Sequence, residues 1–238
     1  MADLLGGRHP AVVFVIAMLA GLAAIAMLSI GVGVLVTRLV EPSWGIGAAG
    51  ERVNVWLAAH RTPSRTDASS FGAIAAGGVV LPIVVGSIVL VSAVLRKWRI
   101  ATFVAFALAV ESATYRATTL VVHSHRPRVP RLEHLPVNAS YPSGHTAASI
   151  AVYGGLVLLL TSRFTSGVFR TFAWVVVLAI VAFVATARMY RGMHHPLDVV
   201  GGVLVGIAAV IVLVFACRTA GAAAESRHAR RMSIRGRA

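Results

Sequence analysis

The feature that most constrains this chain is a series of long apolar runs. Of its 238 residues, 58% are hydrophobic and 13% are charged, a balance far from that of a soluble domain. The runs cover residues 10–37, 70–95, 100–122, 146–161, 171–187 and 197–217. Most approach the roughly 20 residues that a helix needs to cross a bilayer. We therefore expect an all-α, polytopic membrane protein with six transmembrane helices, in which 146–161 is the shortest span.

The charged residues are sorted by side of the membrane. If the N-terminus is cytosolic, most cations fall on the cytosolic side, as the positive-inside rule requires. They are Arg8, Arg96, Lys97, Arg99, Arg163, Arg170, Arg218, Arg227, Arg230, Arg231, Arg235 and Arg237. Both termini are then expected in the cytosol. We interpret the basic tail as a topology signal that contacts anionic lipids, and not as a nucleic-acid arm, although the net charge is +14.

A second group of cations breaks this bias. It lies on the outer side and comprises Arg126, Arg128, Arg131, Arg188 and Arg191, besides the arginines of the first outer loop. Cations in short translocated loops oppose the positive-inside rule and need a local reason. An anionic ligand is the simplest one.

The remaining sequence favours one membrane-embedded domain over residues 1–224 and a basic, disordered cytosolic tail over 225–238. Within the long first outer loop, residues 51–60 have the pattern of an amphipathic interfacial helix, with an ordinary connector as the alternative. Cys217 is the single cysteine, which excludes an intramolecular disulfide and a thiolate metal cluster. The first apolar run is too long for a signal peptide and lacks a clear cleavage pattern.

Polar motifs stand at the ends of four of the expected helices. Arg126 follows the third helix, the segment 141–145 (Tyr-Pro-Ser-Gly-His) opens the fourth, Arg188 closes the fifth and Asp198 opens the sixth. With the N-terminus inside, all four positions fall on the outer side. We therefore expect these segments to meet at one site.

The residue types at this site suit an oxyanion. A helix that begins near Ser143 offers free backbone N–H groups and a positive dipole end, and Gly144 lets an anion approach the main chain. Arg126 and Arg188 can each grip phosphoryl oxygens with two parallel hydrogen bonds. The sequence thus predicts that these four residues bind a phosphate group.

Two histidines and a carboxylate supply the catalytic groups. Asp198, near a helix start, stays ionised and can hold an imidazole N–H of His194. The other ring nitrogen of His194 is then a nucleophile, and His145 can protonate the departing oxygen. The predicted reaction is a two-step displacement through a phosphohistidine, whereas His195 is expected to pack or to form hydrogen bonds.

Each motif also has an ordinary interpretation. The segment 142–145 alone is typical of a helix N-cap. His194, His195 and Asp198 could instead be metal ligands, because positions i and i+4 share a helix face. Since several arginines can neutralise a phosphate, we expect neither a metal nor a cofactor.

The order Arg-Pro, Pro-Ser-Gly-His and then Arg-x5-His-x3-Asp resembles the type 2 phosphatidic acid phosphatase superfamily, the lipid phosphate phosphatases that share a site with vanadium haloperoxidases. The resemblance covers residues 111–202, and the six-helix layout extends it. It implies the helical bundle of these proteins. It also implies the roles already given for the seven site residues: Arg126, Arg188, Ser143 and Gly144 in phosphate binding, His145 as general acid, His194 as nucleophile and Asp198 as its orienting group.

Two positions depart from the family pattern. Thr119 stands where the first motif begins with a lysine, and Ala187 stands where a serine usually precedes the third-motif arginine. The missing lysine removes one phosphate contact. Either Arg116, Arg128 or Arg191 compensates, or the substrate is held less tightly. Thr119, Arg128 and Arg191 are further candidate substrate contacts.

The expected location narrows the substrate. A site that opens at the outer leaflet of the plasma membrane suits an amphiphile whose phosphate lies at headgroup level. Our first choice is an undecaprenyl or decaprenyl diphosphate, converted to the monophosphate. Phosphatidic acid, phosphatidylglycerol phosphate and a phosphoribosylated polyprenol phosphate remain alternatives, as do a vanadium haloperoxidase and a non-catalytic lipid-binding or transport protein.

Overall fold

The computed structural model of the chain describes residues 9–235 except 44, 163 and 165. Arg8, Arg163 and Arg237 of the charge argument lie outside these residues. The helices are α2 (Pro10–Leu35), α3 (Glu41–Ser43), α4 (Ile46–Ala59), α5 (Pro63–Ala75), α6 (Val80–Val94), α7 (Trp98–Val121), α8 (Gly144–Ser149), α9 (Gly155–Thr161), α10 (Gly167–Tyr190) and α11 (Pro196–Arg235), with π-helical turns η1 (Val36–Val40) and η2 (Ile150–Gly154). Across the described ranges the only β pairing is an isolated bridge between Ser124 and Ala139. The predicted all-α class is confirmed.

The described residues contain five continuous helical segments that are long and apolar enough to cross a membrane. They are Pro10–Ser43, Trp98–Val121, Gly144–Thr161, Gly167–Tyr190 and Pro196–Arg230. A sixth span forms if α5 and α6 count together, because they are bent by 44° at a short break. Gly77 and Gly78 lie in this break, where the lack of side chains favours a departure from helix. The chain is thus a multi-pass membrane protein, and the predicted second span is a bent pair of helices.

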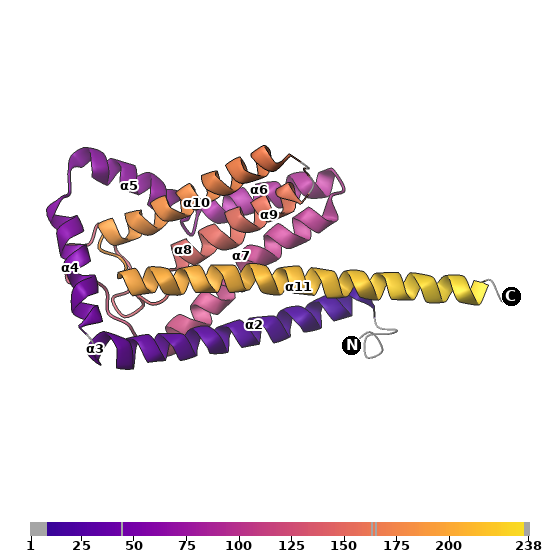
Figure 1. Cartoon of the computed structure of the whole chain (residues 1–238), viewed down its shortest axis with the longest axis horizontal. Coiled ribbons are helices and arrows are strands. Elements are labelled where there is room, and N and C mark those ends of the chain that lie inside the picture. The colour runs from indigo at the N-terminus through magenta and orange to yellow at the C-terminus, as the bar shows by residue number, and fades with distance from the viewer. Residues whose placement is uncertain (1–8, 44, 163, 165, 236–238) are drawn as a thin grey trace.

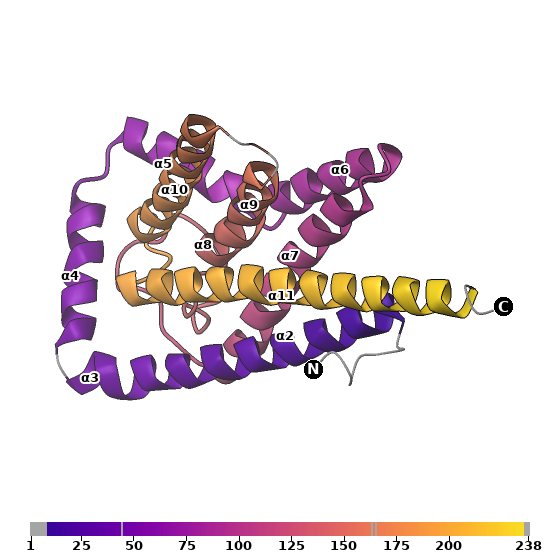
Figure 2. The same ribbon diagram turned by 45° about the vertical axis from the view of Figure 1, so that its right-hand side comes forward.

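The helices form one bundle with two distinct ends. α2 and α11 run side by side, and α2 begins at the same end of the bundle at which α11 leaves it (Figure 1). α4 crosses the opposite end, where α10 ends and where α8 and α11 begin, as a turn of 45° also shows (Figure 2). The motif-bearing helix ends therefore share one end of the bundle.

Two elements of the outer loop and the tail bear on the sequence predictions. The amphipathic helix expected at residues 51–60 forms as α4, where Val55 and Trp56 are exposed and Asn54 is buried. The tail was expected to be disordered, but α11 continues as a helix to Arg235. Alanine-rich sequence around residues 220–224 has high helix propensity and carries the helix onward. The division of the chain at residue 224 stays a prediction.

Glycines let the start of α11 lie directly against α8. A Cβ atom at Gly206 would lie 2.7 Å from the backbone oxygen of Ala147, and one at Gly202 would collide with the backbone oxygen of Ser143. The backbone N–H of Ser143 also donates to the carbonyl oxygen of Asp198 at 2.8 Å. Small residues at membrane helix contacts allow such close approach. The contact fixes the start of α8 against the first turn of α11.

This packing yields a prediction for Gly206→Ala. The added methyl group meets a backbone oxygen that no rotamer change can move, so we expect a loss of about 1–3 kcal/mol in stability. Thermal unfolding in detergent measures the effect. Gly221→Ala is the matched control on the same helix, because a Cβ atom there has no neighbour within 4 Å. Equal melting temperatures for the two variants would contradict the proposed packing.

Candidate active site

The predicted site residues converge on the bundle end that α4 crosses. They come from the loop of residues 122–143, from the start of α8, from the last turn of α10, from the first turn of α11 and from the connection between these two helices. Arg188, Arg126 and His145 all lie close enough to His194 to act electrostatically on its ring. The structure thus brings together residues that the sequence separates widely.

The imidazole of His194 is held in one orientation. Its Nδ1 lies 2.7 Å from the carbonyl oxygen of Ser140, and the residue is only 3% exposed. Because a carbonyl oxygen can only accept, Nδ1 carries the proton and Nε2 presents its lone pair. Burial lowers the pKa of His194 well below its ordinary value, and the positive charges of Arg188 and Arg126 add to this shift. The ring is therefore neutral at physiological pH, as a nucleophile requires.

Asp198 acts on this histidine less directly than expected. Its Oδ2 lies 3.9 Å from Nδ1 of His194, beyond hydrogen-bond distance. The same oxygen instead accepts hydrogen bonds from the Ser140 hydroxyl at 2.6 Å and from the backbone N–H of His195 at 2.7 Å. The second bond is half of a capping box at the start of α11. Asp198 therefore holds Ser140, and Ser140 holds the ring.

Arg188 is fully buried, and two of its three side-chain nitrogens are available to bind a ligand. Its side chain has zero relative exposure, and only Nη1 has a partner, the carboxylate of Glu133, with 2.8 Å to each oxygen. Nε and Nη2 have no hydrogen-bond partner among the described residues. A buried guanidinium with two unpaired nitrogens is poised for an anion, since unmet donors in the interior are costly.

Arg126 is largely committed to the protein itself. Nε donates to the carbonyl oxygen of Pro136 at 2.8 Å, Nη2 donates to that of Ala139 at 2.9 Å, and Nη1 donates to that of Met193. A guanidinium has five N–H donors, so two remain for a ligand. Arg126 joins its loop to the residue before His194, and its predicted phosphate contact can use only those two donors.

The start of α8 supplies uncommitted donors. Ser143 is fully buried and its hydroxyl lies 3.0 Å from that of Thr146. The backbone N–H groups of Gly144 and His145 lie in the first turn, where helical partners are lacking. His145 lies within electrostatic range of both Arg188 and Arg126. The start of α8 therefore lies near Arg188, with backbone donors that the helix itself does not use.

The three further candidate contacts have other surroundings. The Thr119 hydroxyl donates to the Arg116 carbonyl oxygen at 3.1 Å on its own helix. Arg128 uses its backbone N–H to bind Glu51 at 2.8 Å, and its side chain is exposed. Arg191 donates through all three nitrogens, to Glu133, Ser69, Ser70 and Leu132. Arg191 is thus a structural cross-link, and the substrate contacts of all three residues stay predictions.

Sequence reasoning missed two acidic residues at this site. Glu133 forms ion pairs with Arg188 and Arg191. Burial raises the pKa of Glu133, but the two arginines outweigh burial and hold the pKa below its ordinary value. Glu51 on α4 lies 3.1 Å from Nε2 of His195. Burial lowers the pKa of His195, but the interactions with Asp198 and Glu51 outweigh burial, so the pKa lies above its ordinary value. The sequence contains one indication of the role of Glu133: it is the only acidic residue in the loop of residues 122–143, which also contains three arginines.

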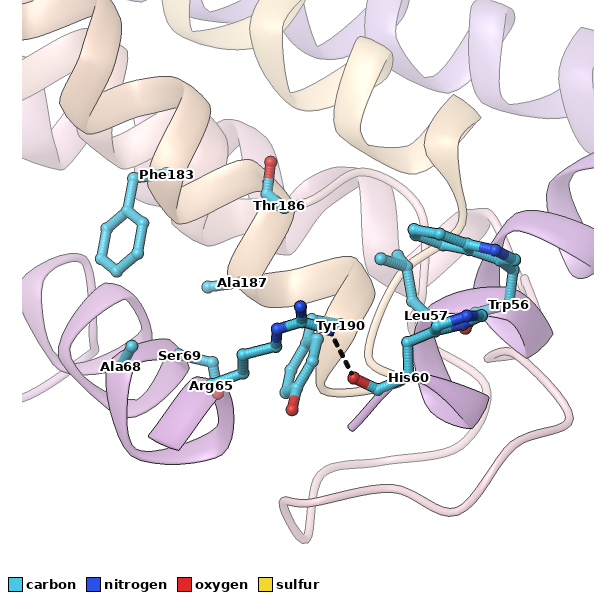
Figure 3. A pocket seen from close by; sticks show the side chains of 10 residues that line it. All are labelled: Trp56, Leu57, His60, Arg65, Ala68, Ser69, Phe183, Thr186, Ala187 and Tyr190. Atoms are coloured by element: carbon cyan, nitrogen blue, oxygen red, sulfur yellow. Dashed lines mark hydrogen bonds between the residues drawn. The ribbon is translucent and has the colours of Figure 1, made fainter. Parts of the chain in front are cut away.

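A cavity of about 350 Å³ lies beside this site, on the other face of α10. Figure 3 shows its largely apolar wall, to which α4 contributes Trp56 and α10 contributes Phe183, with the Arg65 side chain bonded to the His60 carbonyl oxygen at 3.0 Å. None of the predicted catalytic residues lines it. Among the described residues no group of three or more His, Cys, Asp or Glu side chains is arranged to hold a metal ion.

The Glu133 cluster predicts a pH-dependent stability. Because the folded-state pKa of Glu133 lies below its ordinary value of 4.5, its ion pairs stabilise the protein above that pH and are lost as the pH falls through the folded-state pKa. We expect Glu133→Gln to lower the melting temperature at pH 7, with a difference from wild type that shrinks below about pH 4.5. Asp67→Asn, on the exposed face of α5, is the control. A difference that stays constant down to pH 3.5 would argue against the ion pairs.

Comparisons with known proteins agree with the motifs. Residues 100–221, over half of the chain, match the model of the PAP2 superfamily. A segment of 75 residues is 40% identical to an undecaprenyl-diphosphatase of Sulfolobus acidocaldarius, and it covers 32% of this chain and 32% of that protein. The match thus spans about a third of the length of this curated relative.

Solved structures share the fold. A transmembrane PAP2-type phosphatidylglycerolphosphate phosphatase from Bacillus subtilis superposes with a TM-score of 0.66 at 18% identity, over 86% of this chain and 93% of that one. LpxE of Aquifex aeolicus gives a TM-score of 0.55 at 21% identity, over 68% of this chain and 93% of that one. These identities establish the architecture alone. Together with the family match over the motif region, they confirm the resemblance inferred from the motifs: the chain belongs to the PAP2 superfamily.

Proposed function

We propose that this protein is a membrane lipid phosphatase. Its substrate is a polyprenyl diphosphate, undecaprenyl or decaprenyl diphosphate, which it hydrolyses to the monophosphate. The observation that carries the proposal is the pairing of two groups: a neutral His194 whose Nδ1 proton is fixed by the Ser140 carbonyl, and a buried Arg188 with two unpaired nitrogens. A positioned nucleophile beside unpaired cationic donors is the arrangement that phosphoryl transfer needs.

The reaction proceeds in two displacements. In the first, the lone pair of Nε2 on His194 attacks the terminal phosphorus of the diphosphate, the bond from that phosphorus to the bridging oxygen breaks, and His145 gives its proton to that oxygen, which stays on the departing lipid monophosphate. The lipid leaves with one phosphate fewer. In the second, water attacks the phosphohistidine, His145 takes the proton, and the bond between phosphorus and Nε2 breaks. Inorganic phosphate then leaves, and His194 is neutral again.

The positive groups stabilise the charge that develops on the phosphoryl oxygens. Nε and Nη2 of Arg188 present two parallel donors, and the first-turn N–H groups of α8 at Gly144 and His145 present the positive end of a helix dipole. Arg126 adds its two remaining donors. Glu133 holds Arg188 through Nη1 alone, so its carboxylate and a phosphate occupy different edges of the guanidinium. No metal ion is required by this scheme.

The membrane setting supports a lipid substrate. The site lies at one end of an apolar bundle, next to α4 and its exposed apolar side chains. A headgroup phosphate at the membrane surface can reach the site while the hydrocarbon stays in the bilayer. We place this end on the outer face of the plasma membrane, with both termini in the cytosol, because the cations near the other end then follow the positive-inside rule.

The name of the curated relative favours a polyprenyl diphosphate, whereas the B. subtilis structural neighbour is named for phosphatidylglycerolphosphate. We give the sequence match more weight, because it is 40% identical over 75 residues, whereas the structural match at 18% identity supports the fold alone. Phosphate release from both lipids, and from phosphatidic acid, distinguishes the alternatives. Equal turnover of all three would contradict the proposed selectivity.

The His194→Ala variant tests the chemistry. Removal of the nucleophile should reduce phosphate release from undecaprenyl diphosphate in detergent by at least about 10⁴-fold, as losses of covalent nucleophiles do. His125→Ala, which changes an exposed histidine in the same loop as Arg126, is the matched control and should retain wild-type turnover. Turnover in His194→Ala near that of wild type would exclude the phosphohistidine route. Binding of the lipid by a wild-type protein that releases no phosphate would favour a non-catalytic lipid-binding protein.

Chelation tests the role of the arginines. Because guanidinium groups supply the positive charge at the site, we expect phosphate release to continue in 5 mM EDTA at about the untreated rate. A colorimetric phosphate assay before and after dialysis measures this. Loss of activity that Mg²⁺ or Zn²⁺ restores would support a metal-dependent reaction instead.

A further inference from the structure

Tyr115 lies on α7 and packs against the start of α8. If Gly144 carried a Cβ atom, that atom would lie 3.1 Å from Cδ2 and 3.2 Å from Cε2 of the Tyr115 ring. The ring therefore covers the Cα atom of Gly144, the first residue of α8. Its phenol end extends beyond this contact from a helix that supplies none of the predicted catalytic residues.

Two independent electrostatic relations place the phenol near the cationic groups. Burial lowers the pKa of Arg126, and Tyr115 is the strongest neighbour that opposes this shift. Tyr115 is also among the groups that interact electrostatically with Arg188. The side chain thus packs on Gly144 and lies within electrostatic range of Arg126 and Arg188, three of the four residues that the sequence predicts to bind phosphate.

The Tyr115 hydroxyl is uncommitted. No hydrogen-bond partner for it occurs among the described residues. By contrast, the Tyr153 hydroxyl donates to the Ala75 carbonyl oxygen at 2.6 Å, and the Tyr190 hydroxyl lies 3.0 Å from that of Thr66. A half-buried phenol normally finds a partner. Because the hydroxyl is not among the buried unpaired atoms of the described residues, it is open to solvent, and the oxygen of a bound ligand can replace water as its acceptor.

Thr119 does not fill this place. It lies one turn further along α7, and its short side chain bonds to the helix backbone at Arg116. Residues four apart share a helix face, and the longer Tyr115 side chain reaches what the threonine does not.

We propose that Tyr115 is a substrate-binding residue whose phenol O–H donates a hydrogen bond to a non-bridging oxygen of the bound phosphoryl group. The proposal rests on the proposed phosphatase function and adds a donor from α7 to those of α8 and α10. A neutral donor stabilises the negative charge that develops on the phosphoryl oxygens in the transition state. It also leaves the positive charge at the site to the arginines.

Tyr115→Phe is the sharpest test, because it keeps the ring that packs on Gly144 and removes only the hydroxyl. We expect kcat/KM for undecaprenyl diphosphate to fall by about 10- to 100-fold, as for a lost hydrogen bond to a charged group. The vanadate inhibition constant should rise by a similar factor, because vanadate resembles the transition state. Thermal stability should match that of wild type. Tyr153→Phe is the matched control and should change neither constant more than about twofold.

A second measurement does not need turnover. Vanadate and inorganic phosphate should raise the melting temperature of wild type and Tyr153→Phe, and should raise that of Tyr115→Phe less at equal concentration. Equal vanadate stabilisation and equal kcat/KM in Tyr115→Phe and Tyr153→Phe would overturn the proposal. A wild-type protein that releases no phosphate would refute the phosphatase function, while the stabilisation by anions would still decide the role of Tyr115.

Discussion

The site depends on a guanidinium that is buried with only part of its hydrogen bonding satisfied. Arg188 has no contact with solvent, and Glu133 neutralises it through a single nitrogen. The same carboxylate binds Arg191, which in turn donates to Ser69 on α5. This chain of contacts joins α10, the loop of residues 122–143 and α5, and it fixes the plane of the guanidinium. An ion pair that met every donor would stabilise the interior more fully, but it would leave nothing for a phosphate.

The arginines on the site side of the bundle serve the loop as well as the ligand. The described part of the 122–143 loop lacks regular structure apart from one bridge, so many of its carbonyl groups have no ladder or helix partner. Arg126 donates to three backbone carbonyls, and Arg61 donates to those of Pro130 and Tyr190. The excess of cations there was explained from the sequence by an anionic ligand alone. In the structure the donors of Arg126 and Arg61 bind backbone carbonyl oxygens around the site, whereas Nε and Nη2 of Arg188 stay unpaired among the described residues.

What the sequence predicted well follows from long patterns. Apolar runs gave the helices, and motifs at helix ends gave a common site, because a span of fixed length forces its two ends to opposite faces. What it missed depends on single contacts between distant segments. The hydrogen bond from His194 goes to the Ser140 carbonyl because Asp198 is already engaged in capping α11, which no spacing rule reveals. Likewise the commitment of Arg191 to Glu133 and Ser69 requires the loop path in three dimensions.

The cap of α11 and the orientation of His194, the proposed nucleophile, depend on the same carboxylate oxygen of Asp198. Asp198 stabilises the first turn of α11 through the backbone of His195, and with the same oxygen it fixes the hydroxyl of Ser140. The carbonyl oxygen of Ser140 then sets the tautomer of His194. Because Gly202 and Gly206 allow α8 to lie against α11, the start of α8, where we propose that phosphate binds, cannot move independently of that cap. A change at Asp198 therefore acts on the folding of α11, on the orientation of the ring and on the position of α8 together, and its effect on turnover does not measure charge on the imidazole alone.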